Sequence, residues 1–409
     1  MKILGIESSC DETAAAVVED GNKLLSNVVA SSIDLHKQYG GVVPEIAARS
    51  HIESINPVIR EALEQAKTDW ENVDAIAVTY GPGLGGSLLV GVLAARTLAI
   101  LKNKPLYAVN HVEAHVYANF LTSTSLPGYK LPKKAPEFPC LALIVSGGHT
   151  QLVLFENHFK YQVLGKTLDD AVGEAFDKVA KIIGLPYPGG PNVEKAGEAG
   201  DPKTYNFPKP RSTNQAAQID AMQGSKEKRT NRTSGTESES RTQLTQQSAI
   251  SSDGVSGSAR QQVRAMSGLG KYDFSYSGLK TAVLRAAQAE IGEDYTFPSH
   301  MLPDRLSEAQ KANIAASFKH KAIEVLTDKT LLAFNEFAPK SVVIAGGVAA
   351  SKELRRQISD RLPMDVEYTD SKLCTDNAAM IASNGYYQKA SGIEPADPYS
   401  IDINPSLKM

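Results

Sequence analysis

The residues best suited to chemistry by type and spacing are His111 and His115, in the segment Asn-His-Val-Glu-Ala-His at 110–115. On a helix, side chains four positions apart lie ~40° apart around the axis, so both imidazoles can reach one metal ion. A third ligand must come from elsewhere, and an aspartate is chemically suitable. The alternative is a pair of solvent-facing histidines on an amphipathic helix. The segment is not the His-Glu-x-x-His of zinc peptidases, because Glu113 lies ~200° around the helix from His111 and faces away from such an ion.

Two glycine turns indicate a phosphate-bearing ligand. Ser-Gly-Gly-His-Thr at 146–150 and Gly-Gly at 346–347 can each present backbone N–H groups to an anion. Either turn alone can be no more than a tight turn, but their equivalent places in two similar halves favour a nucleotide held between lobes. The acidic stretch 169–181 is either an amphipathic helix, with Asp170, Glu174, Asp177 and Lys178 on one face, or a carboxylate rim for ribose hydroxyls.

The elements that must position these residues repeat along the chain. Residues 2–18 and 140–155 both have the order apolar strand, polar turn, apolar strand. Each copy is later followed by another strand, a glycine turn and a helix, and the second of these helices is expected from about Ser351 to Leu362. This pattern predicts an α/β fold of two lobes with a ligand cleft between them.

The composition limits the class of protein. The chain has 409 residues, 42% hydrophobic and 22% charged, a net charge of −3 and three widely spaced cysteines. These values fit a globular protein of a reducing compartment, without a disulfide framework or a global basic field. We predict a cytoplasmic location, because neither a signal peptide nor an apolar run of ~20 residues is recognisable. Residues 208–271 contain no aromatic residue and only six Ile, Leu, Val or Phe. We expect this segment to be a disordered insertion that is dispensable for the chemistry. Its ten Lys and Arg against five Asp and Glu leave tethering of a nucleic acid through its phosphates as the alternative.

Eight blocks of sequence, in order, resemble one family closely. They are IESSCDET (6–13), YGGVVPEIAAR (39–49), GPGL (81–84), NHVEAH (110–115), IVSGGHTQLV (144–153), DDAVGEAFDKVAKIIGLPYPGGP (169–191), FSYSGLKTA (274–282) and CTDNAAMIA (374–382). The family is that of the tRNA N6-adenosine threonylcarbamoyltransferases (TsaD), also labelled glycoproteases. The resemblance implies a duplicated ribonuclease H-like, actin-like/hsp70-like ATPase fold. The expected lobes are 1–128 with a C-terminal return at 376–409, and 129–375 with 208–271 as the insertion.

The resemblance also implies an activity and its partners. The group transferred would be threonylcarbamoyl, from threonylcarbamoyl-AMP to N6 of the adenosine 3′ of the anticodon (position 37) in tRNAs that read codons beginning with adenine. A paralogous subunit (TsaB-like) and a P-loop ATPase (TsaE-like) would assist, with no membrane involved. One iron(II) or zinc ion per subunit is expected, held by His111, His115 and Asp376. Asp11 matches an acidic residue near the reacting centre and is the candidate base. The matching substrate contacts are Ile144, Val145, Ser146, Gly147, Gly148, Asp177, Gly190 and Glu194.

One departure from the family pattern affects the ligand site. Ser351 stands where the family usually has an asparagine that contacts the ligand, so a hydroxyl replaces an amide at this candidate substrate-binding position. Two other functions remain open from the sequence: a zinc metallopeptidase and a non-catalytic nucleotide-binding scaffold. The absence of an in-register glutamate argues against the first, and the complete set of metal-ligand matches argues against the second. Asp376 itself could alternatively be a helix N-cap, because Thr-Asp-Asn precedes an apolar run.

Overall fold

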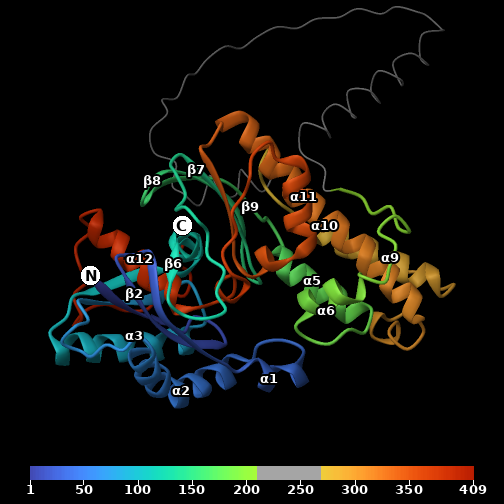
Figure 1. The fold of residues 1–409 in the computed structure, drawn as a ribbon. Helices are drawn as coiled ribbons and strands as arrows, with labels where there is room; N and C mark the ends of the chain where they lie inside the picture. Colours follow the sequence, from blue (N-terminus) through green and yellow to red (C-terminus); the bar gives the residue numbers. More distant parts are fainter. Residues whose placement is uncertain (210–268) are drawn as a thin grey trace, which may run out of the picture. The chain divides into compact units, whose positions relative to one another are not determined.

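The first sheet has six strands in the order β5-β4-β1-β2-β3-β6. Strands β1, β4 and β5 are parallel, whereas β1, β2 and β3 form an antiparallel meander. Helices cover both faces of this sheet, so its central strands are apolar at successive positions. Ile3 packs with α12 on one face, and Leu4 and Ile6 pack with α2 and α3 on the other (Figure 1). The strands are β1 (Lys2–Glu7), β2 (Glu12–Glu19), β3 (Lys23–Ser31), β4 (Ala75–Gly81), β5 (Leu106–Asn110) and β6 (Ser123–Thr124).

The second sheet repeats the central part of the first. Its order is β10-β7-β8-β9, with β10 parallel to β7 and with β7, β8 and β9 antiparallel. The order β4-β1-β2-β3 in the first sheet has the same pairing, so the predicted internal repeat is confirmed. The arrangement is the duplicated ribonuclease H-like fold of actin-like and hsp70-like ATPases. These strands are β7 (Cys140–Val145), β8 (Thr150–Asn157), β9 (Lys160–Lys166) and β10 (Ser341–Ala345).

Side chains cap the start of four of the described α-helices. Asn110 caps α4, Ser307 forms a capping box with Gln310 at α10, and Ser351 and Asn377 cap α11 and α12. The α-helices are α1 (Ile33–His36), α2 (Pro44–Gln65), α3 (Gly85–Lys102), α4 (His111–Tyr117), α5 (Val172–Ile182), α6 (Gly189–Ala196), α9 (Ser277–Glu290), α10 (Glu308–Phe337), α11 (Lys352–Arg361) and α12 (Ala378–Ala390). Short 3₁₀ helices are η1 (Lys37–Tyr39), η2 (Ala118–Phe120), η3 (Ser299–Met301), η4 (Gly347–Ala350) and η5 (Ser371–Leu373).

This computed structural model describes residues 1–209 and 269–409. Met1–Lys209 and Tyr272–Met409 belong to one unit, which contains both sheets. The predicted disorder and dispensability of 208–271 therefore fall almost entirely outside the described residues. The lobe boundaries remain a prediction. The packing of α12 on β1 of the first sheet agrees with the expected return of residues 376–409 to the N-terminal lobe.

Helix α4 joins the two sheets. Its Val112, Val116 and Tyr117 share a hydrophobic cluster with Ile144 of β7 and Val343 of β10. The opposite face of the second sheet packs against α5, α9, α10 and α11. Because α4 also follows β5 directly, its first residue is held at the edge of the first sheet. Residues at the start of α4 are therefore fixed by contacts with both halves of the fold.

Helix α3 is apolar on more than its buried face. Among the described helices it alone has the length and hydropathy of a membrane span, with 33% of that window buried. Its buried residues, including Leu88, Val92 and Ala95, recur at helical spacing and face β4 and α2. Leu89 and Leu93 on its other face are exposed. Packing of one face against the sheet identifies α3 as a helix of the folded core, with a second apolar surface that lacks a covering element among the described residues.

Candidate metal centre and nucleotide-binding site

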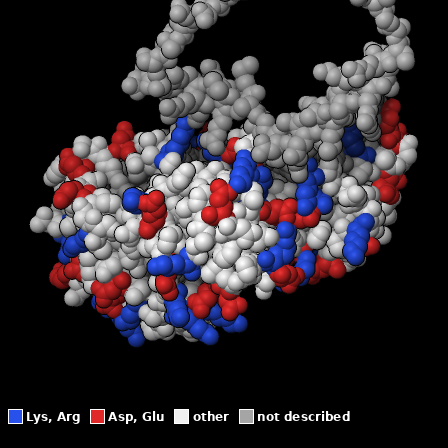
Figure 2. Space-filling view, turned by 90° about the horizontal axis from the view of Figure 1, so that it is seen from above, with Lys and Arg blue, Asp and Glu red and all other residues white. Residues whose placement is uncertain are grey.

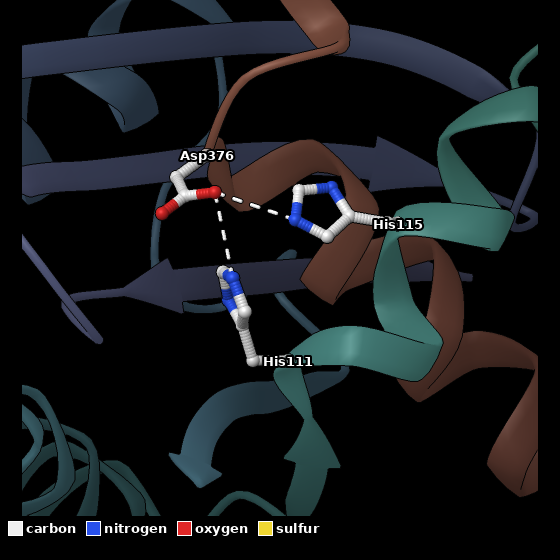
Figure 3. Close-up of side chains that lie close together, drawn as sticks. All are labelled: His111, His115 and Asp376. Atoms are coloured by element: carbon white, nitrogen blue, oxygen red, sulfur yellow. Dashed lines mark ion pairs between the residues drawn. The ribbon is translucent and has the colours of Figure 1, made fainter. Parts of the chain in front are cut away.

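His111 and His115 lie one turn apart at the start of α4 and point toward Asp376 (Figure 3). The Nε2 atoms of His111 and His115 are 3.4 Å and 3.3 Å from Oδ1 of Asp376. One potential ligand atom from each residue lies within 4.8 Å of the other two. The predicted helical spacing of the two histidines is thus confirmed. The aspartate comes from the turn before α12, at the other end of the sequence.

The donor set fits a metal ion. Both ring nitrogens of His115 are buried and make no hydrogen bond within the described part of the chain, although burial of an unpaired polar atom is costly. A metal ion would satisfy Nε2. Two imidazoles and a carboxylate suit zinc and iron(II) alike, and three protein ligands leave positions open for substrate.

The charges of this group are strongly coupled. Burial alone would lower the pKa of His111, but the carboxylates of Asp376 and Glu7 raise it well above its usual value. Burial alone would raise the pKa of Asp376, but His111 and His115 hold it far below the usual range. Without metal, these two carboxylates therefore favour the doubly protonated ring of His111. A metal ion would replace the proton that faces Asp376.

Asp376 does not cap α12. The cap is Asn377, whose side-chain oxygen accepts a hydrogen bond from the Met380 amide (3.1 Å). Its amide group donates to the carbonyl oxygens of Leu373 (3.1 Å) and Thr375 (2.8 Å). The alternative that Asp376 is the N-cap of α12 is therefore wrong, because Asn377 is the N-cap. Asp376 is left with its carboxylate directed at the two histidines.

Glu113 faces away from His111 and His115, in agreement with the helical spacing. Its carboxylate is buried and accepts hydrogen bonds from the Asn384 amide (3.0 Å) and from the hydroxyl of Tyr161. Burial raises its pKa. It thus lacks the placement needed to activate a metal-bound water, which argues against peptidase chemistry.

The two glycine turns follow neighbouring parallel strands of the second sheet and meet at its carboxyl-terminal edge. The expectation that they occupy equivalent places in the two halves is therefore wrong. Ser146–Gly148 follows β7 and Gly346 follows β10. Gly346 has φ of 90°, and a Cβ there would collide with the Val145 carbonyl group, so glycine is required. Gly147 and Gly148 have open space where a Cβ would be. Ile144 and Val145, in contrast, are fully buried core residues. A ligand at this edge would therefore meet the turn rather than the two side chains before it.

The acidic stretch forms α5, but its helix begins later than expected. Asp170 precedes the first residue, Val172, so it does not share the helical face with Glu174, Asp177 and Lys178. It accepts instead from the Lys178 ammonium group (2.6 Å). Asp177 accepts from the amide of Gly189 (2.6 Å), and Gly190 also donates to it. Asp177 therefore fixes the start of α6 while lying beside the turn that carries Gly190.

Glu194 and Ser351 contact each other. The Ser351 hydroxyl donates to Oε2 of Glu194 (3.0 Å) and also caps α11 at the Leu354 amide (3.3 Å). Lys319, a largely buried residue of α10, donates to the Glu194 carbonyl oxygen (3.3 Å), and its Nζ is 3.7 Å from the Glu194 carboxylate. Ser351 thus links the turn after β10 to the acidic side chain of α6. Lys319 was missed by sequence reasoning, because a lysine on a long helix gives no signal of its buried partner.

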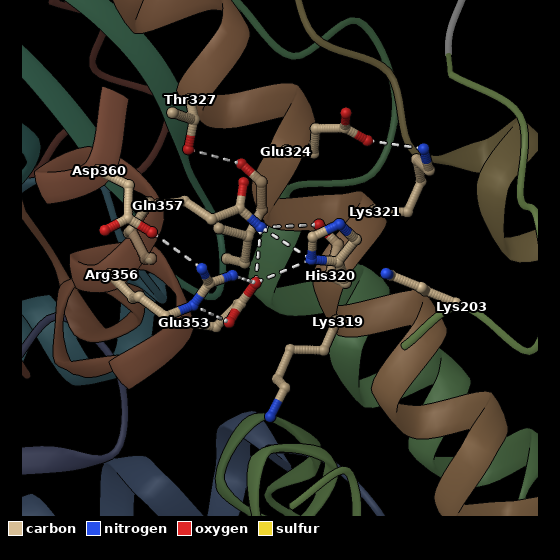
Figure 4. A network of polar contacts seen from close by, with 12 residues as sticks. Lys203, Lys319, His320, Lys321, Glu324, Thr327, Glu353, Arg356, Gln357 and Asp360 are labelled. Atoms are coloured by element: carbon tan, nitrogen blue, oxygen red, sulfur yellow. Dashed lines mark hydrogen bonds and ion pairs between the residues drawn. The ribbon is translucent and has the colours of Figure 1, made fainter. Parts of the chain in front are cut away.

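A polar network holds α11 against α10 (Figure 4). Glu353 of α11 contacts Arg356 (2.7 Å), Gln357 (2.7 Å) and His320 of α10 (2.9 Å). Burial alone would raise the pKa of Glu353, but these hydrogen bonds lower it to about 2. Lys319 extends from α10 away from this network (Figure 4). The network therefore secures α11, the helix that Ser351 caps.

Asp11 lies in the turn between β1 and β2, next to a second carboxyl group. It is nearly buried, and the side chain of Glu12 is hydrogen-bonded to it. Burial and the charges of Asp376 and Asp11 raise the pKa of Glu12 to about 9. Glu12 is therefore a protonated acid at neutral pH and donates to Asp11. Asp376 and Asp11 are near enough for both charges to act on Glu12, which places Asp11 in the neighbourhood of the candidate metal centre.

Two further residues, His149 and Tyr187, approach this region from turns in the segment that follows β7. Burial and the positive charges of His111 and His115 lower the pKa of His149 to about 4. Burial and the negative charges of Asp11 and Asp177 raise the pKa of Tyr187. Both lie in turns that sequence reasoning singled out for their glycines and prolines rather than for these side chains. Only the folded structure shows that His149 lies near His111 and His115 and that Tyr187 lies near Asp11 and Asp177.

The duplicated ribonuclease H-like arrangement of the two sheets places this protein in the actin-like/hsp70-like fold class. The glycine turns at the strand ends form a candidate nucleotide-binding site, and the His–His–Asp group forms a candidate metal centre. The model of one family, described as TsaD, tRNA N6-adenosine threonylcarbamoyltransferase, matches residues 23–226 and 218–383. The chain belongs to this family.

Proteins of that name are similar over their full length. One from Thermomicrobium roseum is 44% identical, with 100% of this chain and 97% of the relative covered. One from Dehalococcoides mccartyi is 43% identical, with 100% and 99% covered. A solved structure, component A of the Acidaminococcus fermentans (R)-2-hydroxyglutaryl-CoA dehydratase, is 13% identical with a TM-score of 0.43, and 95% of this chain and 99% of that chain are covered.

Proposed function

We propose that this protein transfers a threonylcarbamoyl group from threonylcarbamoyl-AMP to N6 of the adenosine 3′ of the anticodon in tRNAs reading codons that begin with adenine. The observation that carries the proposal is full-length similarity to transferases of this name. The site geometry supports it, because a nucleotide cradle and a candidate metal centre belong to one unit of the fold. In this reaction the adenine amine attacks the carbonyl carbon of a carbamoyl–phosphate mixed anhydride. A C–N bond forms, the C–O bond to phosphate breaks, and AMP leaves.

The protein's own residues would align the donor. Gly147 and Gly148 would meet its phosphate through backbone amides, together with the turn that ends at Ser351. Ser146 would lie beside the ligand and hold this turn, because its amide donates to the His149 carbonyl oxygen (2.8 Å). Glu194 would accept a hydrogen bond from a ribose hydroxyl. Asp177, which accepts from the Gly190 amide, would hold Gly190 in place for the same ligand. Positioning of this kind is the main requirement, because the carbonyl group of the mixed anhydride is already activated.

The N6 amine must lose a proton during the transfer, and the candidate base lies in the turn between β1 and β2. Asp11 is the candidate base for the N6 proton, and Glu12, which donates to Asp11, would orient its carboxylate. His111, His115 and Asp376 would hold one iron(II) or zinc ion, which when bound supplies Lewis-acid polarisation of a carbonyl oxygen. The donor set does not distinguish the two metals.

Partner proteins and tRNA are part of this proposal. Leu89, Leu93 and Ile100 form an exposed stripe on one face of α3, which suits a hydrophobic contact with a paralogous TsaB-like subunit. A TsaE-like ATPase completes the set. On the face shown in Figure 2, Lys and Arg alternate with Asp and Glu over the described residues. Charge therefore does not mark an RNA surface on that face. The proposal that this protein acts on tRNA in the cytoplasm rests on its family instead.

The test is nucleoside analysis of tRNA. Purified protein and its partner subunits are incubated with unmodified tRNA and threonylcarbamoyl-AMP, and the digested tRNA is examined by mass spectrometry. We expect threonylcarbamoyladenosine, with equimolar AMP released. His111→Ala is the matched negative control. Cleavage of a glycoprotein that His111→Ala abolishes, without tRNA modification, would instead establish the peptidase alternative. Nucleotide binding without metal or transfer would establish the scaffold.

A further inference from the structure

Glu7 is a fully buried carboxylate at the end of β1. Three donors surround it. The Ser9 amide donates to Oε1 (2.6 Å), the Thr79 hydroxyl donates to Oε2 (2.5 Å), and Nδ1 of His111 is 3.0 Å from Oε2. Burial alone would raise the pKa of Glu7, but His111 lowers it. A buried charge is costly unless it is paired and hydrogen-bonded, and here both conditions are met.

The strand arrangement brings these groups together. Strands β1, β4 and β5 are parallel neighbours, so Glu7, Thr79 and the start of α4 lie at the same edge of the sheet. The Ser9 amide and the Thr79 hydroxyl hold the carboxylate at both oxygens. Its orientation is therefore set before any ligand binds, and the oxygen shared with Thr79 faces the imidazole of His111.

The two nitrogens of His111 have different neighbours. Nδ1 faces Glu7, with the Ser9 hydroxyl also 3.1 Å away, and Nε2 faces Asp376. His115 differs, because its Nδ1 is buried without a hydrogen bond among the described residues. We propose that Glu7 is a positioning residue that keeps the proton of His111 on Nδ1 and so presents the Nε2 lone pair to the metal ion. This inference rests on the proposed metal centre.

A glutamine at position 7 would reverse this arrangement. The Ser9 amide can only donate, so the glutamine carbonyl oxygen would stay opposite Ser9. The glutamine NH₂ group would then face Nδ1 of His111, which would have to accept. The ring proton would move to Nε2, where it competes with the metal. Loss of a partner of this kind typically costs 10–100-fold in metal affinity.

Glu113 supplies a matched control. It is also a buried carboxylate, it lies on α4 between the two histidines, and it faces Asn384 and Tyr161 instead of either imidazole. Glu113→Gln makes the same chemical change on the same helix. A general effect of removing a buried charge near α4 would therefore appear in both variants. An effect on the His111 ring would appear only in Glu7→Gln.

The experiment measures Zn²⁺ affinity by competition with a chromophoric chelator, for the full-length wild type, Glu7→Gln and Glu113→Gln. Two-bond ¹H–¹⁵N spectra of histidine-labelled, zinc-loaded protein show which ring nitrogens carry protons. We expect affinity to fall about 10–100-fold in Glu7→Gln and by less than about threefold in Glu113→Gln. We also expect the wild-type His111 proton on Nδ1. Equal affinity of wild type and Glu7→Gln, or equal losses in both variants, would overturn the role of Glu7 alone. Failure of the wild type to bind Zn²⁺ would overturn the metal centre and this inference with it.

Discussion

Adjacent substitutions at Asp376 and Asn377 separate metal binding from helix capping. Asp376 approaches both histidines through Oδ1, whereas Asn377 caps α12 and bonds to two carbonyl groups. Asp376→Ala removes a third of the protein's ligand set and leaves the cap intact. Asn377→Ala removes the cap and leaves the three ligands. The two variants should therefore fail in different assays.

The magnitudes follow from these contacts. Loss of an N-cap costs about 1 kcal/mol, and each carbonyl left without its donor adds about 0.5–1.5 kcal/mol. We expect Asn377→Ala to lower the free energy of unfolding by about 2–4 kcal/mol. A ligand at a hundredfold excess over its Kd stabilises the folded state by about 2.7 kcal/mol. That increment from zinc should persist in Asn377→Ala and vanish in Asp376→Ala.

The assay is thermal or urea unfolding of the apo and zinc-loaded forms, with metal content measured after gel filtration. Wild type and Asn377→Ala should retain one ion per chain, and Asp376→Ala should retain none. If Asp376→Ala keeps stoichiometric metal, the assignment of Asp376 as a ligand is wrong. If Asn377→Ala loses metal as completely as Asp376→Ala, then the turn before α12 is too loosely held for the two roles to be separate, and the reasoning from the cap fails.

Three further outcomes are expected. Because the pKa of His111 is raised and metal binding displaces its Nε2 proton, zinc affinity should rise with pH in chelator competition; a flat profile would contradict this. Glu194→Gln should weaken binding of AMP or ATP by about 1–3 kcal/mol in calorimetry, whereas Ser351→Asn, which retains a good N-cap, should leave it unchanged or tighter. A loss with Ser351→Asn would show that this turn has another geometry. Because the pKa of Glu353 is lowered from 4.5 to about 2, its ionised form stabilises the fold at pH values above 4.5. We expect Glu353→Gln to cost about 1–2 kcal/mol of unfolding free energy at pH 7, and this difference should shrink as the pH falls from 4.5 toward 2.

The sequence predicted the sheets and the paired histidines well, because both signals are local. ILGI (3–6) and CLALIV (140–145) are continuous apolar runs, and they form most of strand β1 and all of strand β7. The spacing of His111 and His115 depends only on helix geometry. The start of α5 was predicted less well, since Asp170 has no local feature that separates it from the helix it precedes. It is held outside the helix by its pairing with Lys178.

The rest of the candidate site depends on contacts between distant segments. Spacing alone could not identify Asp376, which entered only through the resemblance to a family. Glu7 ends an apolar strand and gave no sign that it faces His111. Lys319 and Glu194 likewise meet only because α10 and α6 pack together. A useful signal is nonetheless present: Glu7, Asn110 and Ser146 are each the polar residue at or just beyond the carboxyl end of a strand with parallel neighbours.

The placement of candidate site residues at strand ends bears on the predicted dispensability of residues 208–271. The site residues are fixed at the strand ends and first turns of α4, α6, α11 and α12. The chain leaves the described core after Phe207 and returns at Tyr272, and both of these side chains are buried in the same hydrophobic cluster as α5 and α10. Lys209 is anchored to Glu324 and Asp328 of α10. The elements that carry the site are therefore tied to one core on both sides of the insertion. This anchoring supports the prediction that residues 208–271 are dispensable for the chemistry.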